Sequence, residues 1–485
     1  MAAADPASRL TRILGVAPWV IATMCLFTHL PLAPLQPANR DGITFADGIA
    51  AYDVTQWRPH WPGYPVLVLA GKAAALATGD PFLALRLLSV ICTSVSAILL
   101  AGLARTLAEE RGATPVGALG TGAAAALLWT AMPVSWLDGT EMFSDPLALA
   151  LALGMAWALV RGGRHAMPLA GLLGAGVLGA RLSYLFLLGP LVVAVLRAPD
   201  RAAARRGALG LILGCAAWWA WQLAMDGLGW FQAGWVFLQG FWGDWGGSSL
   251  TDPGVERRPA RLLYTFLRYP LGAWWPGLPL VRLLPTLFVL LAGGAGLARA
   301  RGTRTGAVLA QLTLPYLAWI GFAHSVDLAR YTMPFAAALV VLLATGLPRR
   351  GGAALLAGMV AIYAAIAVPL ARKHADIAPL GIQAGRYLEA HLDPRRTTIL
   401  LSTPSPFLPR YAPAFPVSIL EPGREEAQVD ALLSAGQTVV ATRDMLLGAR
   451  LALRGWSPLV DLTQDPDVVS RGPWVVHLYA RGPAP

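Results

Sequence analysis

Residues that could do chemistry gather in the segment 41–65, DGITFADGIAAYDVTQWRPHWPGYP, which directly follows the first apolar run of the chain. Most of the remaining chain is apolar, so a polar loop at this place is the first candidate for a reactive site. Its carboxylates are Asp41, Asp47 and Asp53. Asp47, in the sequence FADG, is the candidate of most interest, and the others are assigned structural roles as helix caps or solvated acids. His60 lies shortly before the PGYP turn, and Tyr64 lies within it.

A second acidic loop, LDGTEMFSDP, carries three more carboxylates: Asp138, Glu141 and Asp145. Because Asp145 precedes a proline at the start of an apolar run, a helix N-cap is the alternative role for it. No DxD or HxxxH spacing is present. The sequence therefore gives no firm support for a metal site in this loop.

Two arginines stand where apolar runs meet outer loops. Arg330 lies with Tyr331 in HSVDLARY, and Arg181 lies in GARLSY, flanked by apolar residues. An arginine at such a place either extends toward interfacial water or binds a phosphate group, which guanidinium pairs bidentately. A charge flanked by apolar sequence is costly, which favours the functional alternative for Arg181.

The composition indicates a polytopic membrane protein. Of 485 residues, 56% are hydrophobic and 13% are charged, with a mean hydropathy of +0.55. Soluble domains carry about 25% charged residues. The net charge of +11 comes from short basic clusters between apolar runs. This distribution is typical of cytoplasmic loops and argues against nucleic acid as a partner. The three cysteines lie inside apolar runs, where no disulfide framework is expected.

The hydrophobic pattern predicts about eleven transmembrane helices. The expected spans are 14–32, 82–107, 116–136, 146–160, 167–179, 185–196, 208–225, 283–298, 307–322, 332–347 and 353–370. With this count the strongly basic loops fall on one side, and the acidic and aromatic loops, with the C-terminal part, fall on the other. Helices that lie along the membrane surface are expected at 45–54 and 61–77, within the outer loop 41–79, and the Trp-rich outer segment 226–282 is expected at the interface.

From residue 376 the composition becomes that of a soluble protein, and the segment 376–485 is expected to be a separate, small α/β domain outside the membrane. Expected helices are 382–392, 425–434 and 444–454. Expected strands are 397–402, 438–441 and 474–479. The segment 1–375 is then the transmembrane domain.

These motifs, in this order, resemble the GT-C glycosyltransferases, in particular the bacterial relatives of protein O-mannosyltransferases and of the aminoarabinose transferase that modifies lipid A. Besides the first loop with its HWPGYP segment, the matching stretches are ALRLLSVICTSVSAILLAGLARTL, MPVSWLDGTEMFSDPLALALAL, GARLSYLFLLGP and ARYTMPFAAAL. An outer α/β tail completes the pattern, so the resemblance covers nearly the whole chain.

The resemblance implies a polyprenyl-phosphate sugar as donor, bound from the outer leaflet of a bacterial inner membrane, and an extracytoplasmic acceptor. Asp47 would deprotonate or orient the acceptor hydroxyl, and Arg330, with Arg181 and Tyr331, would hold the lipid phosphate. His60 and Tyr64 would line the donor pocket. Acids that would shape the site are Asp138, Glu141 and Asp145. No cofactor is firmly implied, and a divalent cation is left open.

Two other classes of protein compete with this interpretation. A transporter or lipid flippase often shows repeated halves and polar residues near the middle of the membrane, whereas no repeat is found here and the polar candidates gather at the outer face. A scaffold protein would leave the outer acids and arginines unexplained. The sequence names neither the sugar nor the acceptor.

Overall fold

The computed structural model describes residues 6–37, 39–198, 200–244, 248–252, 254–376, 378–402, 405–421, 423–464 and 475–482. The chain divides into two compact units. The first comprises Met1–Leu35 and Phe45–Ala375, and the second comprises Gln36–Thr44 and Asp376–Pro485.

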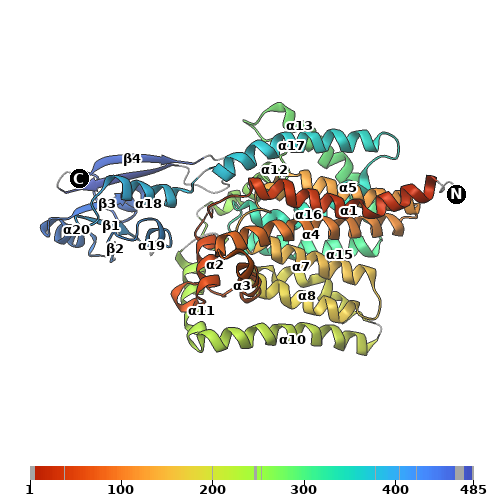
Figure 1. Ribbon diagram of the computed structural model, residues 1–485, viewed down its shortest axis with the longest axis horizontal. Coiled ribbons are helices and arrows are strands. Elements are labelled where there is room, and N and C mark those ends of the chain that lie inside the picture. The colour runs from red at the N-terminus through yellow and green to blue at the C-terminus, as the bar shows by residue number, and fades with distance from the viewer. Residues whose placement is uncertain are drawn as a thin grey trace. The chain divides into compact units, whose positions relative to one another are not determined.

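The first unit is built from helices (Figure 1). They are α1 (Pro6–His29), α2 (Arg40–Ala50, which begins in the second unit), α3 (Pro65–Thr78), α4 (Pro81–Glu110), α5 (Pro115–Ala131), α6 (Pro133–Trp136), α7 (Asp145–Arg161), α8 (Ala166–Ala180), α9 (Gly189–Leu196), α10 (Arg201–Asp226), α11 (Gly229–Gln239), α12 (Arg258–Arg268), α13 (Leu283–Phe288), α14 (Gly294–Ala300), α15 (Arg304–Ala323), α16 (Met333–Gly346) and α17 (Gly352–Asp376). A short π-helical stretch, Val289–Gly293, joins α13 to α14.

Seven stretches of the described residues are long and apolar enough to cross a membrane. They are Leu10–Leu32, Pro81–Glu110, Arg201–Asp226, Leu280–Ala300, Arg304–Ala323, Ala329–Gly346 and a part of Gly352–His391. The protein is therefore a multi-pass membrane protein. The other expected spans coincide with shorter helices, such as α5 with 17 residues and α8 with 15. Because a bilayer-crossing helix needs about 20 residues, the count of eleven stays a prediction.

Local capping fixes where several long helices begin. The Asp80 carboxylate accepts a hydrogen bond from the Leu83 N–H, with Pro81 as the first residue of α4, as the Asp-Pro pair predicts. Thr114 caps α5 in the same way.

The helix bounds predicted in the first loop are wrong. Instead of 45–54, α2 ends at Ala50, and Asp53 then caps a 3-10 turn by accepting hydrogen bonds from the N–H groups of Thr55 and Gln56. Instead of 61–77, α3 begins at Pro65, because Gly63, with a φ of +96°, and Tyr64, with a φ of +47°, lie in left-handed conformations that no right-handed helix contains.

The second unit contains a five-stranded sheet in the order β2-β1-β3-β5-β4. The strands are β1 (Thr397–Leu401), β2 (Val417–Ile419), β3 (Thr438–Thr442), β4 (Ser457–Thr463) and β5 (Val475–Arg481). The strand β1 pairs in parallel with β2 and β3, whereas β5 is antiparallel to β3 and β4. Alternate residues of β1 face opposite layers: Ile399 packs with α18 (Leu380–His391) and α19 (Leu408–Tyr411), and Leu400 packs with α20 (Glu425–Ser434) and α21 (Arg443–Gly448).

The expected helix 444–454 is wrong, because α21 ends at Gly448 and Arg450 takes a left-handed conformation. The sequence pattern did not predict β2, which has three residues, or β4. Of the expected strand 474–479, residue 474 lies outside the described residues.

The helices of the first unit pack closely around α4, which contacts α1, α3, α5, α7 and α16. Along one side of the unit, α8 lies between α7 and α10 (Figure 1). The contact between α14 and α16 depends on glycines. A Cβ placed on Gly296 would clash with the backbone carbonyl of Leu342, and one on Gly346 would clash with that of Ala292.

Replacing Gly296 by alanine is therefore expected to push α14 and α16 apart and to destabilise the protein by about 1–3 kcal/mol, the usual range for overpacking. Gly294→Ala is the matched control, because a Cβ there meets no described atom within 4 Å. Thermal unfolding of the purified variants in detergent measures the difference. Equal melting temperatures for the two variants would contradict this close packing.

Candidate functional site

A buried ion pair lies where α7 begins and α8 ends. Arg181, the residue after α8, places Nη1 3.0 Å from Oδ2 of Asp145, the first residue of α7, and both side chains are almost completely buried. The Tyr184 hydroxyl donates to Oδ1 of Asp145 at 3.1 Å, and Arg181 donates to Oγ of Ser144 at 2.8 Å. The N-cap of α7 is Ser144, so the alternative role of Asp145 as an N-cap is wrong.

Aromatic rings surround the arginines of this region. The Arg181 guanidinium lies over the ring of Tyr331, with 5.2 Å from Cζ to the ring centroid. The Arg330 guanidinium lies 4.4 Å from the ring centroid of Phe143 and 5.3 Å from that of Tyr331. Because Arg330 is only 7% exposed, it does not extend to interfacial water. The guanidinium groups of Arg181 and Arg330 also act electrostatically on one another.

Hydrogen bonds to α4 and α5 fix the second acidic loop. Thr93 Oγ1 donates to the Gly139 carbonyl at 2.6 Å, and Trp129 Nε1 donates to the Thr93 carbonyl at 3.0 Å. A Cβ on Gly139 would lie 2.6 Å from the Ser135 carbonyl oxygen, so the turn requires glycine. Within the loop, Oε1 of the buried Glu141 lies 2.5 Å from Nε2 of His374, near the end of α17.

Asp138 completes the acidic group. Burial, followed by repulsion from Asp145, raises the pKa of its carboxyl group from 3.8 to about 7. Glu141 adds to this rise, whereas His374 and Arg330 oppose it. The structure thus brings together all three acids of the second loop with Arg181, Arg330 and Tyr331.

The first loop contributes an aromatic wall. Nε2 of His60 lies 2.8 Å from the Tyr64 hydroxyl oxygen, and the ring of Phe45 packs on both of these side chains. His60 also stacks on Phe237 of α11. Tyr64 acts electrostatically on Arg181 and contacts His60. The role of His60 and Tyr64 as the lining of a donor pocket stays a prediction.

Asp47 lies on α2, two residues after Phe45. At 3.6 residues per turn, two residues correspond to about 200° around the helix axis. Asp47 is therefore on a different face of α2 from the one that packs on His60 and Tyr64. Lys72 fixes the end of this helix, because Nζ donates to the Ile49 carbonyl at 2.7 Å. The role of Asp47 as a base stays a prediction.

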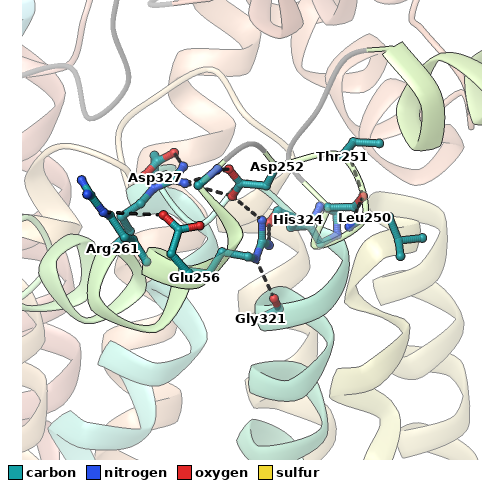
Figure 2. Close-up of polar contacts among 12 residues, drawn as sticks. Leu250, Thr251, Asp252, Glu256, Arg261, Gly321, His324 and Asp327 are labelled. Carbon is teal, nitrogen blue, oxygen red and sulfur yellow. Dashed lines mark hydrogen bonds and ion pairs between the residues drawn. The ribbon is translucent and has the colours of Figure 1, made fainter.

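An ionic network holds the loop that carries Arg330. Asp252 pairs with Arg258 at 2.7 Å and with Arg261 at 2.9 Å, and Arg261 also pairs with Asp327. Figure 2 shows Asp252 and Asp327 on either side of this network, with His324 beside it. Arg258 donates to the backbone carbonyls of Gly321 and His324, the last turn of α15.

His324 touches this network through its backbone carbonyl, and its imidazole is buried. Neither ring nitrogen has a hydrogen-bond partner among the described residues, and the ring packs against Tyr331, with 4.7 Å between centroids. Burial, and then the charges of Arg181, Arg330 and Arg258, lower the pKa of His324 to about 3. His324 is therefore neutral at pH 7 and offers one N–H donor and one acceptor.

Some residues of the site were missed in the sequence. His374, Tyr184, Phe143 and Ser144 have no local pattern that distinguishes them from residues of an ordinary helix end. Within the described parts of the chain, no three His, Cys, Asp or Glu side chains are arranged to hold a metal ion.

The fold of the chain is similar to that of several solved structures. No family model and no curated protein matches the chain. Among solved structures, the arabinofuranosyltransferase AftD from mycobacteria matches with a TM-score of 0.53 and 16% identity, over 98% of this chain and 40% of AftD. ArnT from Cupriavidus metallidurans, bound to undecaprenyl phosphate, matches with a TM-score of 0.51 and 16% identity, over 97% of this chain and 99% of ArnT.

The oligosaccharyltransferase of Archaeoglobus fulgidus matches with a TM-score of 0.51 and 13% identity, over 90% of this chain and 70% of that protein. All three are GT-C glycosyltransferases, so the resemblance seen in the sequence is confirmed at the level of fold. The chain spans less than half the length of AftD and nearly the whole of ArnT.

Breaking the ion pair on one side is expected to be costly. Arg181→Gln leaves Asp145 buried without its counter-charge, a change that typically costs about 3–5 kcal/mol. The double variant with Asp145→Asn should recover much of this loss, because no unpaired charge remains. Arg105→Gln is the control, since its pair with Glu109 is exposed and such pairs contribute about 0–1 kcal/mol. Chemical unfolding of the wild type and the three variants tests this, and a double variant no more stable than Arg181→Gln would contradict it.

The raised pKa of Asp138 predicts a pH dependence. The folded protein disfavours ionisation of this carboxyl group, so the wild type should lose stability relative to Asp138→Asn as pH rises from about 4 to about 7. Above pH 7 the difference should stay constant. Melting temperatures of both proteins, measured from pH 4 to 9, check the sign. A wild type that gains stability relative to Asp138→Asn as pH rises would show that the carboxyl group is stabilised in its charged form.

Proposed function

We propose that the chain is a membrane glycosyltransferase that transfers a pentose or hexose from a polyprenyl-phosphate-linked donor to an extracytoplasmic acceptor. The observation that carries this proposal is the placement of two buried arginines beside a group of carboxylates at one end of the helices. Buried arginines are suited to a phosphate leaving group, and a nearby carboxylate is suited to an acceptor hydroxyl.

Side chains near Arg181 and Arg330 have hydrogen-bond donors without a partner among the described residues. Nε of Arg181 has no hydrogen-bond partner among the described residues, and Asp145 holds the opposite edge of the same guanidinium. The neutral imidazole of His324 packs on Tyr331 as well. A phosphate near Tyr331 would thus receive hydrogen bonds from Arg181 and His324 and the positive charge of Arg330.

The reaction would be a single displacement. The acceptor oxygen forms a bond to the anomeric carbon while the bond from that carbon to the phosphate oxygen breaks, so the anomeric configuration inverts. The electron pair leaves with the phosphate, whose charge lies next to Arg330 and Arg181. The acceptor proton passes to a carboxylate, for which we propose Asp47.

The solved structure of ArnT with undecaprenyl phosphate supports a lipid-linked donor for this fold. The candidate carboxylates and the two buried arginines gather at one end of the helices, which favours transfer at a membrane face over transport through the bilayer. We place this end outside the plasma membrane of a bacterium, on the basis of the basic loops at the opposite end. The acceptor is a cell-envelope glycan, a lipid or a protein.

Sugar transfer from synthetic polyprenyl-phosphate pentoses and hexoses tests the proposal. The wild type should transfer at least one of these sugars, and Asp47→Asn should lower the rate by about 10²–10⁴-fold, the usual contribution of a general base. Asp80→Asn is the control, because Asp80 only caps α4. Equal rates for Asp47→Asn and wild type would remove Asp47 as the base and turn attention to Asp138.

Donor binding gives a second readout. Arg330→Gln should weaken the binding of polyprenyl phosphate, the lipid product, by tenfold or more, whereas Asp47→Asn should leave it unchanged. A wild type that neither transfers any of the sugars nor binds polyprenyl phosphate would overturn the proposed function.

A further inference from the structure

A cavity of about 950 Å³ lies at the end of the helices opposite to the candidate site. The helix α16 connects the two regions: Arg330 precedes its first residue, Met333, and the cavity borders its last turn at Ala344 and Thr345. The 14 residues of α16 span about 21 Å. Nothing in the proposed reaction uses this cavity, so it requires a separate explanation.

Three arginines line the cavity, each at the end of a different helix. They are Arg111 after α4, Arg299 in the last turn of α14 and Arg349 after α16. Arg111 donates to the backbone carbonyls of Arg299 and Arg301, and Arg299 donates to those of Thr345 and Leu347. These bonds join three helix ends into one rim. All three residues are exposed.

The neighbouring acids do not neutralise this rim. Glu109 pairs with Arg105 one turn earlier on α4, at 2.7 Å. Glu110 accepts hydrogen bonds from the backbone N–H of Thr305 and so stabilises the start of α15. Both carboxylates are thus engaged with groups that do not line the cavity, which leaves the rim with a positive charge.

The rest of the lining is mostly apolar, and many of its residues are alanine or glycine. Leu107 and Ala124 are buried beneath it, and Gly120 and Ala298 lie along its sides. A Cβ on Gly120 would meet no atom within 4 Å in the described part of the chain. The lining therefore combines guanidinium groups at a helix-end rim with an apolar surface that has room for a hydrocarbon chain.

We propose that this cavity binds an anionic phospholipid, with the phosphate at Arg111, Arg299 and Arg349 and an acyl chain along the apolar surface of α5 and α14. Guanidinium groups pair with phosphate oxygens through two parallel hydrogen bonds. Basic pockets between transmembrane helices at the cytoplasmic face suit such headgroups, and the positive-inside rule places these arginine-rich loops at that face. The bound lipid would join the ends of α4, α14 and α16.

The protein reconstituted in nanodiscs of phosphatidylcholine with phosphatidylglycerol tests the proposal, with lipid retention measured by native mass spectrometry after transfer to detergent. The wild type should retain phosphatidylglycerol in preference to phosphatidylcholine. Arg349→Gln should lower that retention at least threefold, and Arg349→Lys should restore part of it. Arg350→Gln is the matched control, because Arg350 is the adjacent exposed arginine and is not part of the lining.

A second pair of variants tests the apolar part without changing charge. Gly120→Leu should fill the cavity and lower retention, whereas Gly294→Leu, on an exposed face of α14, should not. Thermal unfolding identifies any variant that fails to fold. Equal loss from Arg349→Gln and Arg350→Gln would show attraction to the surface charge alone, and equal retention of both lipids by the wild type would show an apolar groove alone. Either result overturns the proposal, whether or not the chain transfers sugar.

Discussion

The ion pair between Asp145 and Arg181 is the interaction on which the arrangement of the site depends. Moving two charges out of water costs several kcal/mol per ion, and attraction offsets this only when hydrogen bonds satisfy the remaining atoms. Here Tyr184 donates to the carboxylate, Ser144 accepts from the guanidinium, and the start of α7 adds its positive helix end. These partners come from α7, from the end of α8 and from the 3-10 turn that follows it. The pair therefore holds the start of α7 against the end of α8 and the 3-10 turn.

The positive charges of Arg181 and Arg330 are compensated by a carboxylate and by aromatic rings. Asp145 neutralises one edge of Arg181, and the aromatic rings of Tyr331 and Phe143 cover the guanidinium faces of Arg181 and Arg330. The two arginines can then lie close enough to act on one another electrostatically. Asp138 and Glu141 add negative charge on the side of His374. The region thus has an acidic part and a basic part side by side, as the proposed displacement at an anomeric carbon with a phosphate leaving group would require.

Much of this arrangement follows from the sequence, because acidic loops and loop-edge arginines alternate with basic loops at helix spacing. The grouping of Asp138, Glu141 and Asp145 with Arg181 and Arg330 needs only the side of the membrane on which each loop falls. Contacts between distant segments are different. Nothing near His374 indicates that it meets Glu141, and a single sequence carries no signal for a pair of residues on separate helices. The predicted start of the second helix in the first loop is wrong for a local reason, because the backbone at Gly63 and Tyr64 is left-handed.

The two ends of α16 show how the surroundings of an arginine determine what it can bind. At one end Arg330 is buried among rings and carboxylates, so a phosphate there must fit a fixed set of donors and lose its water. At the other end Arg349 is exposed on a rim with two further arginines and an apolar floor, where a headgroup keeps part of its hydration. In the proposed function, the first environment would select one ligand and stabilise a developing charge, whereas the second would accept different anionic lipids. The proposed chemistry and the proposed lipid anchoring would then lie at opposite ends of one helix.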